Sequence, residues 1–192
     1  MVEVNIQFAK VRPDAIIPSK RDEDMGFDIY ACFDEDYILI NPHETKLIPT
    51  GIASACDPGY GFLLFERGST GSKGIARRCG VIDSGYRDEW FVGLTNTTNK
   101  ELYISKVGKE DIVKKQIEII ESKDGFGIDV DPLLYKLVED AVLNAIIYPY
   151  SKAIVQAIVT PVLKTKEQEL TYEDLKAIPS ERGLGSLGSS GK

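Results

Sequence analysis

Short apolar segments separated by turn-forming residues recur through the first half of the chain, and this spacing limits the fold more than any other feature. From Val2 to Phe8 apolar residues alternate with polar ones, which is the period of a half-buried strand. Further strands are expected at 24–31, Tyr37–Ile40, Leu47–Ile52 (an edge strand interrupted by Pro49 and Gly51), Phe62–Phe65 and Trp90–Thr95. Turns at intervals of about 8–12 residues are typical of a β-sandwich or β-barrel, so the sequence predicts an all-β core.

A helical pattern interrupts this β pattern. The segment from Glu101 to Tyr150 is far longer than a connection between strands needs. Within it, Asp131-Pro132 is typical of a helix N-cap followed by proline at the first helical position. The apolar repeat that follows is Leu134, Leu137, Val138, Ala141, Val142, Ala145 and Ile146, with Tyr148-Pro149 expected to end it. A weaker helical repeat is Ile112, Val113, Gln116, Ile117 and Ile120, separated from the first by 124–127.

These patterns divide the chain into three parts. Residues 1–104 and 149–163 are expected to form the β core, to which a strand at Ile154–Val159 returns. Residues 105–148 are expected to be an α-helical insert, and 164–192 a charged linker followed by a Gly/Ser-rich arm. Composition alone predicts that this arm is flexible.

Charge and composition exclude several classes of function. The net charge of −7 argues against general nucleic-acid binding, because the chain has no broad basic field. No apolar run approaches the roughly 18 residues of a membrane helix, and the first residues do not resemble a signal peptide. The three cysteines, Cys32, Cys56 and Cys79, have no metal-binding spacing and fit reduced thiols, so a cytoplasmic location is expected.

One acidic residue stands where an apolar segment meets a tight turn. Val81-Ile82 suits the end of a strand and Ser84-Gly85 suits a turn, with Asp83 between them. A carboxylate placed there is partly sheltered and can hold a water as a general base. The alternative is a hairpin in which Asp83 serves only the turn.

A second segment has the composition of a phosphate-binding loop. Residues 66–74 contain three glycines and three hydroxyl side chains together with Arg67 and Lys73. Backbone N–H groups and cations in such a loop can bind phosphate oxygens, although the spacing of a P-loop is absent. A plain surface loop is the alternative. Among Asp24, Asp28, Asp83 and Glu89, no two are spaced like a metal pair on one helix, and Asp24 and Glu89 are expected to be solvated loop carboxylates. Phosphates of a substrate can themselves hold Mg²⁺.

Five segments, in this order, resemble the trimeric deoxyuridine triphosphatases (dUTPases). They are 24–31, 67–75, 80–87, 152–161 and 182–191, of which Gly80-Val81-Ile82-Asp83-Ser84-Gly85-Tyr86-Arg87 is the most specific. The resemblance implies a jelly-roll-like β-barrel of the β-clip class, a homotrimer with active sites shared between subunits, and hydrolysis of dUTP to dUMP and pyrophosphate. It covers most of the chain apart from the insert and the linker.

The resemblance also implies a role for each matched residue. Asp83 is expected to be the catalytic base that activates water for attack on the α-phosphorus, and Tyr86 to lie under the deoxyribose and exclude a 2′-hydroxyl. The backbone at Gly80, Val81 and Ile82 is expected to pair with uracil. The other expected substrate-binding residues are Arg67, Gly68, Ser69, Gln156, Arg182, Leu187, Gly188, Ser189 and Ser190. Mg²⁺ is the expected cofactor, chelated by the triphosphate, with Asp28 acting on it through water.

Four positions depart from the family pattern. Gly68 stands where serine is common, and Asp88 where glycine is usual. An arginine of the fourth segment is replaced by Ala153, or displaced to Lys152. Leu187 replaces an aromatic residue that stacks on uracil, so weaker closure over the base is expected, without loss of activity.

Two alternatives stay open. A deoxycytidine triphosphate deaminase, or a bifunctional enzyme, has the same fold and a similar phosphate loop, but Tyr86-Arg87 and the Gly/Ser arm favour the dUTPase. A dUTPase-derived regulatory module without activity is the other, against which the intact Asp83 and Tyr86 argue. For the insert, a structural addition is favoured over a surface for a protein partner.

Overall fold

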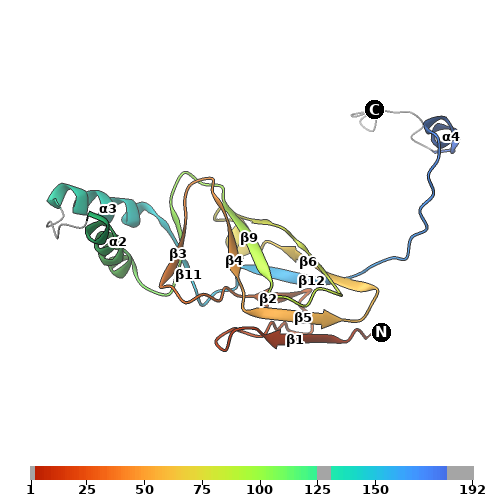
Figure 1. Ribbon diagram of the computed structural model, residues 1–192, viewed down its shortest axis with the longest axis horizontal. Helices are drawn as coiled ribbons and strands as arrows, with labels where there is room; N and C mark the ends of the chain where they lie inside the picture. Colours follow the sequence, from red (N-terminus) through yellow and green to blue (C-terminus); the bar gives the residue numbers. More distant parts are fainter. Residues whose placement is uncertain (1–2, 125–130, 181–192) are drawn as a thin grey trace. The chain divides into compact units, whose positions relative to one another are not determined.

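The computed structural model describes residues 3–124 and 131–180, which fall into two units, one up to Val162 and one from Leu163. Among these residues the first unit holds twelve strands and three helices (Figure 1). Short strands with one inserted pair of long helices confirm the predicted all-β class.

The elements of the first unit alternate with short turns up to the insert. Its strands are β1 (Ile6–Lys10), β2 (Gly26–Ile29), β3 (Tyr37–Ile40), β4 (Thr45–Pro49), β5 (Ile52–Cys56), β6 (Tyr60–Phe65), β7 (Ile75–Arg78), β8 (Val81–Asp83), β9 (Phe91–Asn96), β10 (Leu102–Ser105), β11 (Ile146–Pro149) and β12 (Val155–Pro161). Its helices are α1 (Gly68–Gly71), α2 (Lys109–Asp124) and α3 (Pro132–Asn144).

The strands pair in four small sheets. The sheet that positions the candidate site has the order β2-β12-β6-β8, and a second has the order β4-β9-β7. The other two are β11-β10-β3 and the pair β1-β5. Within the described residues every strand pair is antiparallel except β10 with β11. β7 belongs to the sheet β4-β9-β7 and β8 to the sheet β2-β12-β6-β8, so the segment that joins them runs from one sheet to another.

An aromatic cluster fills the middle of the core. Trp90 is fully buried, with its ring centroid 5.0 Å from that of Phe62 and 5.9 Å from that of Phe8. Aliphatic residues from most strands surround it, and each such side chain contributes about 1.5–3 kcal/mol on full burial. This packing fixes β6, which pairs with the Asp83 segment, and the start of β9, which follows that segment in the sequence.

The prediction of one edge strand over Leu47–Ile52 is wrong, because a sharp corner divides it. Gly51 has φ +67°, and a Cβ there would lie 2.8 Å from the Sγ of Cys32. The chain therefore leaves β4, which pairs with β9, and enters β5, which pairs with β1. Glycine is required here both for its left-handed backbone and for lack of space.

The helical insert forms as predicted at its start but ends earlier. The side chain of Asp131 accepts a hydrogen bond from the backbone N–H of Leu133 at 2.9 Å, which confirms the N-cap. The apolar repeat extends to Ile146, yet α3 stops at Asn144 because Ala145 is extended. Residues 146–149 instead form β11, parallel to β10. The β-branched and aromatic residues of this segment favour a strand once a neighbour is available.

A second, smaller apolar cluster holds the insert to the strands. It consists of Tyr103, Ile112, Val113, Ile117, Val142 and Ala145. Tyr103 comes from β10, so the helices pack on the same small sheet into which the chain returns. In Figure 1 the two helices lie side by side next to β3 and β11.

The described part of the second unit contains one short helix, α4 (Tyr172–Ala177), which no sequence pattern predicted. The Thr171 hydroxyl accepts a hydrogen bond from the N–H of Asp174 and caps it. None of the helices in the described residues is long and apolar enough to span a membrane.

Candidate functional site

Asp83 lies at the rim of a small hollow with mostly apolar walls, here called the base hollow. Its lining residues are Leu47, Cys79, Val81, Ile82, Asp83, Tyr86 and Phe91, and its volume is about 280 Å³. The side chains of β8 alternate, so that Val81 and Asp83 are exposed while Ile82 is buried in the core. The hollow has room for a nucleobase and part of a sugar, and not for a triphosphate.

The Asp83 carboxylate is exposed and has no hydrogen bond or ion pair within 3–124 and 131–180. Its backbone is firmly held, because Asp83 pairs with Gly61 of β6 and its carbonyl accepts a hydrogen bond from the N–H of Tyr86 at 3.1 Å. A fixed backbone with an unpaired carboxylate fits a group that holds a water or a ligand.

A hairpin closed at Ser84-Gly85, the alternative interpretation of this segment, is not formed. The two residues make a turn, but β8 pairs with β6, and the next strand, β9, pairs with β4 and β7. Since β8 is an edge strand, one row of its backbone N–H and C=O groups has no partner strand among the described residues. The carbonyl of Gly80 is already an acceptor for the N–H of Leu64 at 2.8 Å. Hydrogen-bonded pairs alternate along an antiparallel ladder, so Ile82, opposite Phe62, also faces β6, and Val81 between them offers the freer backbone groups.

Tyr86 is held beside Asp83 by the loop that follows. Its hydroxyl donates a hydrogen bond to the carbonyl of Glu89 at 3.0 Å. Arg87 reaches back to the carbonyls of Ser84 and Tyr86. Glu89, which the sequence suggests is a surface carboxylate, accepts a hydrogen bond from the N–H of Gly51 at 2.7 Å and anchors the loop to the β4–β5 corner.

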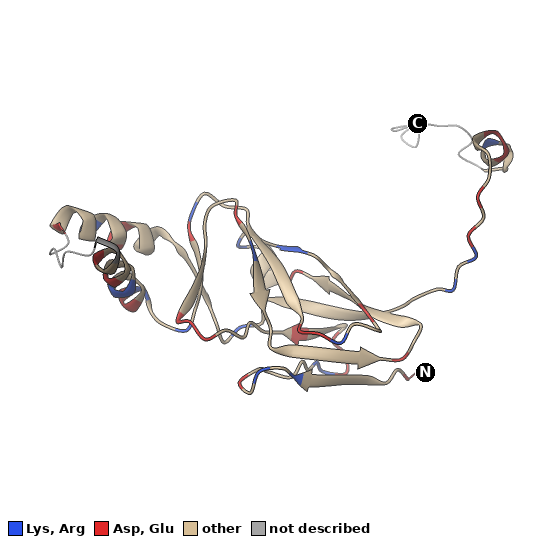
Figure 2. Cartoon of the chain, viewed as in Figure 1, with Lys and Arg blue, Asp and Glu red and all other residues tan. Residues whose placement is uncertain are grey.

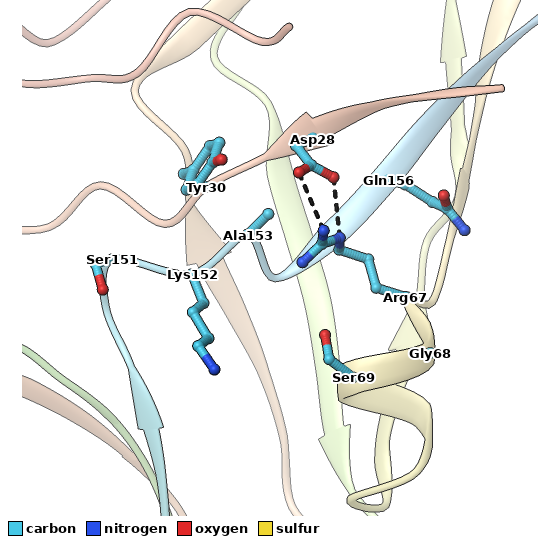
Figure 3. Close-up of a pocket in the computed structure, with 9 residues that line it drawn as sticks. All are labelled: Asp28, Tyr30, Arg67, Gly68, Ser69, Ser151, Lys152, Ala153 and Gln156. Carbon is cyan, nitrogen blue, oxygen red and sulfur yellow. Dashed lines mark hydrogen bonds and ion pairs between the residues drawn. The ribbon is translucent and has the colours of Figure 1, made fainter. Parts of the chain in front are cut away.

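Arg67 and Asp28 form an ion pair in a second, charged hollow, here called the phosphate hollow (Figure 3). The Nε of Arg67 is 2.9 Å from Oδ1 of Asp28, and its Nη2 donates to Oδ2 at 3.1 Å. Both side chains are about one-third exposed. The hollow is lined by Asp28, Tyr30, Arg67, Gly68, Ser69, Ser151, Lys152, Ala153 and Gln156. The structure thus brings together Arg67, Gly68, Ser69, Gln156 and Asp28.

Thr70 shapes the loop that carries Arg67 and Ser69. It is buried, and its hydroxyl accepts a hydrogen bond from the N–H of Arg67 and donates one to the Arg67 carbonyl, both at 3.0 Å. At Gly68 an added Cβ would meet nothing within 4 Å. The common serine would therefore fit, and the departure at Gly68 leaves the loop unchanged in shape.

Gln156 connects this loop to β12. Its Nε2 donates to the carbonyl of Glu66 at 3.0 Å, and glycine at 26 leaves room for its amide. Burial raises the pKa of Glu66, but hydrogen bonds from backbone N–H groups, including that of Arg77, and the neighbouring arginine charges outweigh it. The pKa of Glu66 therefore lies below its ordinary value.

Lys152 is a further candidate for phosphate binding. The sequence indicated it only as a substitute for the family's arginine in the fourth segment. Its side chain extends into the phosphate hollow on the side facing Ser69 (Figure 3), whereas Ala153 is buried. Arg67 is neutralised by Asp28, but no acidic partner of Lys152 is found in the described part of the chain. Lys152 therefore supplies the uncompensated positive charge of this hollow.

The two hollows lie at opposite ends of β6. Asp83 pairs with Gly61 at the start of β6, whereas Arg67 lies two residues beyond Phe65, the last residue of β6. Since a strand rises about 3.3 Å per residue, these positions are on the order of 20 Å apart. One chain therefore does not bring Asp83 and Arg67 to the same phosphate.

Several expected site residues, namely Arg182, Leu187, Gly188, Ser189 and Ser190, lie outside the described residues. Across 3–124 and 131–180, no group of three or more His, Cys, Asp or Glu side chains is arranged to hold a metal ion. Asp28 is engaged by Arg67, which fits a carboxylate that would reach a metal only through water.

The dUTPase family model matches residues 12–109, a segment that contains β2, the Arg67 loop and β8. The deoxyuridine 5′-triphosphate nucleotidohydrolase of Neisseria meningitidis serogroup A (strain Z2491) is 34% identical over 104 residues, covering 52% of this chain and 69% of that protein. That of Buchnera aphidicola from Acyrthosiphon pisum (strain Tuc7) is 29% identical over 144 residues, covering 66% and 93%.

Solved structures of similar fold include dUTPases of staphylococcal phages. The phage 80alpha dUTPase with dUpNHpp has a TM-score of 0.63 and 18% identity, covering 98% of this chain and 99% of that chain. The phage phi11 dUTPase, studied for its species-specific insert, has a TM-score of 0.57 and 17% identity, covering 87% and 96%. At this identity the likeness shows the shared jelly-roll-like β-clip fold alone.

Proposed function

The chain belongs to the dUTPase family, and we propose that it hydrolyses dUTP to dUMP and pyrophosphate with Asp83 as the catalytic base. The observation that carries the proposal is the Asp83 carboxylate at the rim of a base-sized hollow, with no partner among the described residues. In this position it can accept a proton from a water that attacks the α-phosphorus in line, a contribution typically worth about 10²–10⁴-fold in rate.

The base hollow accounts for the selection of deoxyuridine. The free backbone groups of Val81 on the open edge of β8 pair with uracil, and cytosine, with its reversed donor and acceptor pattern, leaves buried polar groups unpaired. Tyr86, tied to Glu89, lies under the sugar and leaves no space for a 2′-hydroxyl. Discrimination against UTP is thus steric, and discrimination against dCTP depends on hydrogen bonds.

The phosphate hollow holds the triphosphate. Arg67, Ser69 and Lys152 line it and supply two cations and a hydroxyl, while Gln156 fixes the loop. Gly68 contributes its backbone. Arg182 binds the phosphates and 187–190 close over the base and the γ-phosphate in this proposal. Mg²⁺, when bound, neutralises charge and fixes the phosphate chain. Oxygen atoms of the substrate would hold it, and Asp28 would act on it through water.

We further propose a homotrimer whose active sites are shared between subunits. The support is the distance along β6, because a base hollow and a phosphate hollow about 20 Å apart on one chain can serve one nucleotide only if different chains supply them. A head-to-tail arrangement that closes a ring supplies such pairs repeatedly.

Pyrophosphate release from dUTP, dCTP, dTTP and UTP, with and without Mg²⁺, tests the activity. Release from dUTP with strong preference over the other three is expected. Ammonia release from dCTP would support the deaminase alternative. No turnover of any nucleotide by a folded protein would support a regulatory module and would overturn the proposed function.

Mixing two inactive variants tests the shared site. Asp83→Asn and Arg67→Ala are each expected to be nearly inactive alone. After mixed refolding or co-expression, random assembly gives some sites an intact Asp83 from one chain and an intact Arg67 from another, so about a quarter of wild-type activity should return. Mixed oligomers without recovered activity would contradict sharing.

A second candidate function concerns the insert. Leu133, Leu137 and Leu143 on α3 are more than half exposed, and Figure 2 shows few charges on α3 compared with α2. This surface supports a role in binding a protein partner, beside a purely structural one.

Deletion of 109–144 tests this role. Because β10 and β11 are parallel, the linker that replaces the insert must be about a dozen residues long to return from the end of β10 to the start of β11. An active trimer after deletion would support a separate role, and a collapsed one a structural role.

A further inference from the structure

Arg77 lies beneath the turn that leads into the Asp83 segment, and it belongs to neither hollow. Its backbone is in β7, and its guanidinium packs against the ring of Phe65, with Cζ 5.8 Å from the ring centroid. Its N–H donates to Oε1 of Glu66 at 2.9 Å. The side chain therefore spans from the end of β6 to the connection between β7 and β8.

The Arg77 guanidinium also lies against Gly80. A Cβ added at Gly80 would lie 2.9 Å from Cζ of Arg77 and even closer to its Nη1. The third neighbour of that Cβ is a backbone atom, the carbonyl oxygen of Leu64, at the longer distance of 3.3 Å. The Arg77 guanidinium thus occupies the place of a side chain at position 80, and any larger residue there would require the guanidinium to move.

The backbone of Cys79, the residue before Gly80, shows that the turn between β7 and β8 must be held by surrounding contacts. Cys79 has φ +54°, the left-handed conformation that a residue with a Cβ rarely adopts. Such conformations persist where surrounding contacts hold them. Here the contacts are the Leu64–Gly80 hydrogen bond at 2.8 Å and the guanidinium below Gly80.

The chemistry of Arg77 argues against a simple filling role. Its Nε is buried and has no hydrogen-bond partner among the described residues, so an apolar side chain of similar length would fill this space without an unsatisfied donor. The planar, charged group can, however, lie flat between the Phe65 ring and the Gly80 backbone, which a flexible chain cannot do.

We propose that Arg77 is a positioning residue for the base hollow. It supports the Cys79-Gly80 turn and thereby sets the place of the Val81–Ile82 backbone and of the Asp83 carboxylate. This inference rests on the proposed function and adds to it a residue that contacts neither substrate nor water.

A double-mutant cycle with Arg77→Ala, Gly80→Ala and the double variant tests the proposal. Each single variant is expected to lower kcat/KM for dUTP by about 100-fold, as displacement of a catalytic group by about 1 Å can do. In the double variant the Cβ introduced at position 80 no longer meets a guanidinium, so its loss should be no greater than that of Arg77→Ala alone. Losses that multiply would overturn the proposal.

Product inhibition separates positioning from general damage. With Arg77→Ala the Ki of dUMP should rise by about 10-fold or more, whereas that of pyrophosphate should stay within about twofold, because the phosphate hollow is not moved. Equal loss of both, or loss of neither, would contradict the proposal. Arg78→Ala is the matched control: Arg78 is the next residue of β7 and bonds Thr95 Oγ1, away from Gly80.

If Arg77→Ala does not fold, Arg77→Lys decides, because lysine keeps the stem and the charge but not the planar group. A selective rise in the Ki of dUMP supports the proposal, and wild-type values contradict it. Failure of the proposed function is distinguishable, since it would appear as absence of dUTP turnover in the wild-type protein.

Discussion

The base hollow and the phosphate hollow differ in how their charges are supported. In the base hollow the single carboxylate of Asp83 stands among apolar side chains without a partner in the described part of the chain. In the phosphate hollow Arg67 is paired with Asp28, and Lys152 adds a second cation. An activity that depends on one carboxylate is lost when that carboxylate is replaced. Binding that is shared among several cations weakens only in part when one of them is replaced. The two regions should therefore respond differently to substitution.

The largest effect is expected at Asp83. Asp83→Asn keeps the shape but cannot take a proton, so kcat for dUTP should fall by about 10²–10⁴-fold with little change in KM. Steady-state kinetics of the folded variant measure this. Asp88→Asn is the control, because the Asp88 side chain bonds only the neighbouring Glu89 N–H among the described contacts. If both variants kept the wild-type kcat, Asp83 would not be the base.

In the phosphate hollow the losses should be graded. Lys152→Ala should raise KM for dUTP by about 10-fold, the effect of one charged hydrogen bond. Arg67→Ala should cost more, since it also leaves Asp28 as an uncompensated negative charge near the phosphates. Lys73→Ala serves as the control because Lys73 lines neither hollow. Equal effects of Lys73→Ala and Lys152→Ala would mean that the overall charge of the protein, and not a local contact of Lys152, sets the affinity for dUTP.

Of the three thiols, only Cys79 lines either hollow, so its reactivity reports on the base hollow. Burial raises the pKa of Cys32, whereas Cys79 is exposed in the base hollow. Iodoacetamide should therefore label Cys79 first and Cys32 last, because the thiolate is the reactive form. Mass spectrometry of partly labelled protein measures the order. Addition of dUMP should protect Cys79 and pyrophosphate should not, and the reverse result would exchange the roles of the hollows.

The smallest effect concerns acid. The Glu66 carboxylate has a pKa below its ordinary value of 4.5, so its contribution to stability is complete above that pH and is lost as the pH falls through the folded-state pKa. Glu66→Gln should therefore lower Tm at neutral pH by about 2 °C and reduce the further loss below pH 4.5. Glu121→Gln, on the exposed side of α2, should change neither. Parallel Tm curves for wild type and Glu66→Gln would contradict this.

Local patterns predicted the elements better than their connections. The alternation at β1, the short apolar runs at β3 and β6 and the Asp131-Pro132 helix start were sufficient to place those elements, because neighbouring residues determine them. The corner at Gly51 and the end of α3 at Asn144 depend on partners far along the chain, namely Cys32 and the strand β10. No window of sequence contains that information.

The candidate site shows the same division. Asp83, Arg67 and Asp28 could be named from their segments, but their separation along β6 could not. Arg77 belongs to no recognisable motif, and only the position of its guanidinium against Gly80 identifies it. Lys152 became the stronger candidate once Arg67 was found to be neutralised by Asp28.

The length of β6 has a consequence for how strongly a nucleotide binds. If two chains complete each site, dUTP binds the assembled protein and not the separated chains, so binding and assembly are thermodynamically linked. The apparent affinity would then rise with protein concentration, and a bound nucleotide would oppose dissociation of the subunits. A six-residue strand would thus make the oligomeric state itself respond to the supply of nucleotide.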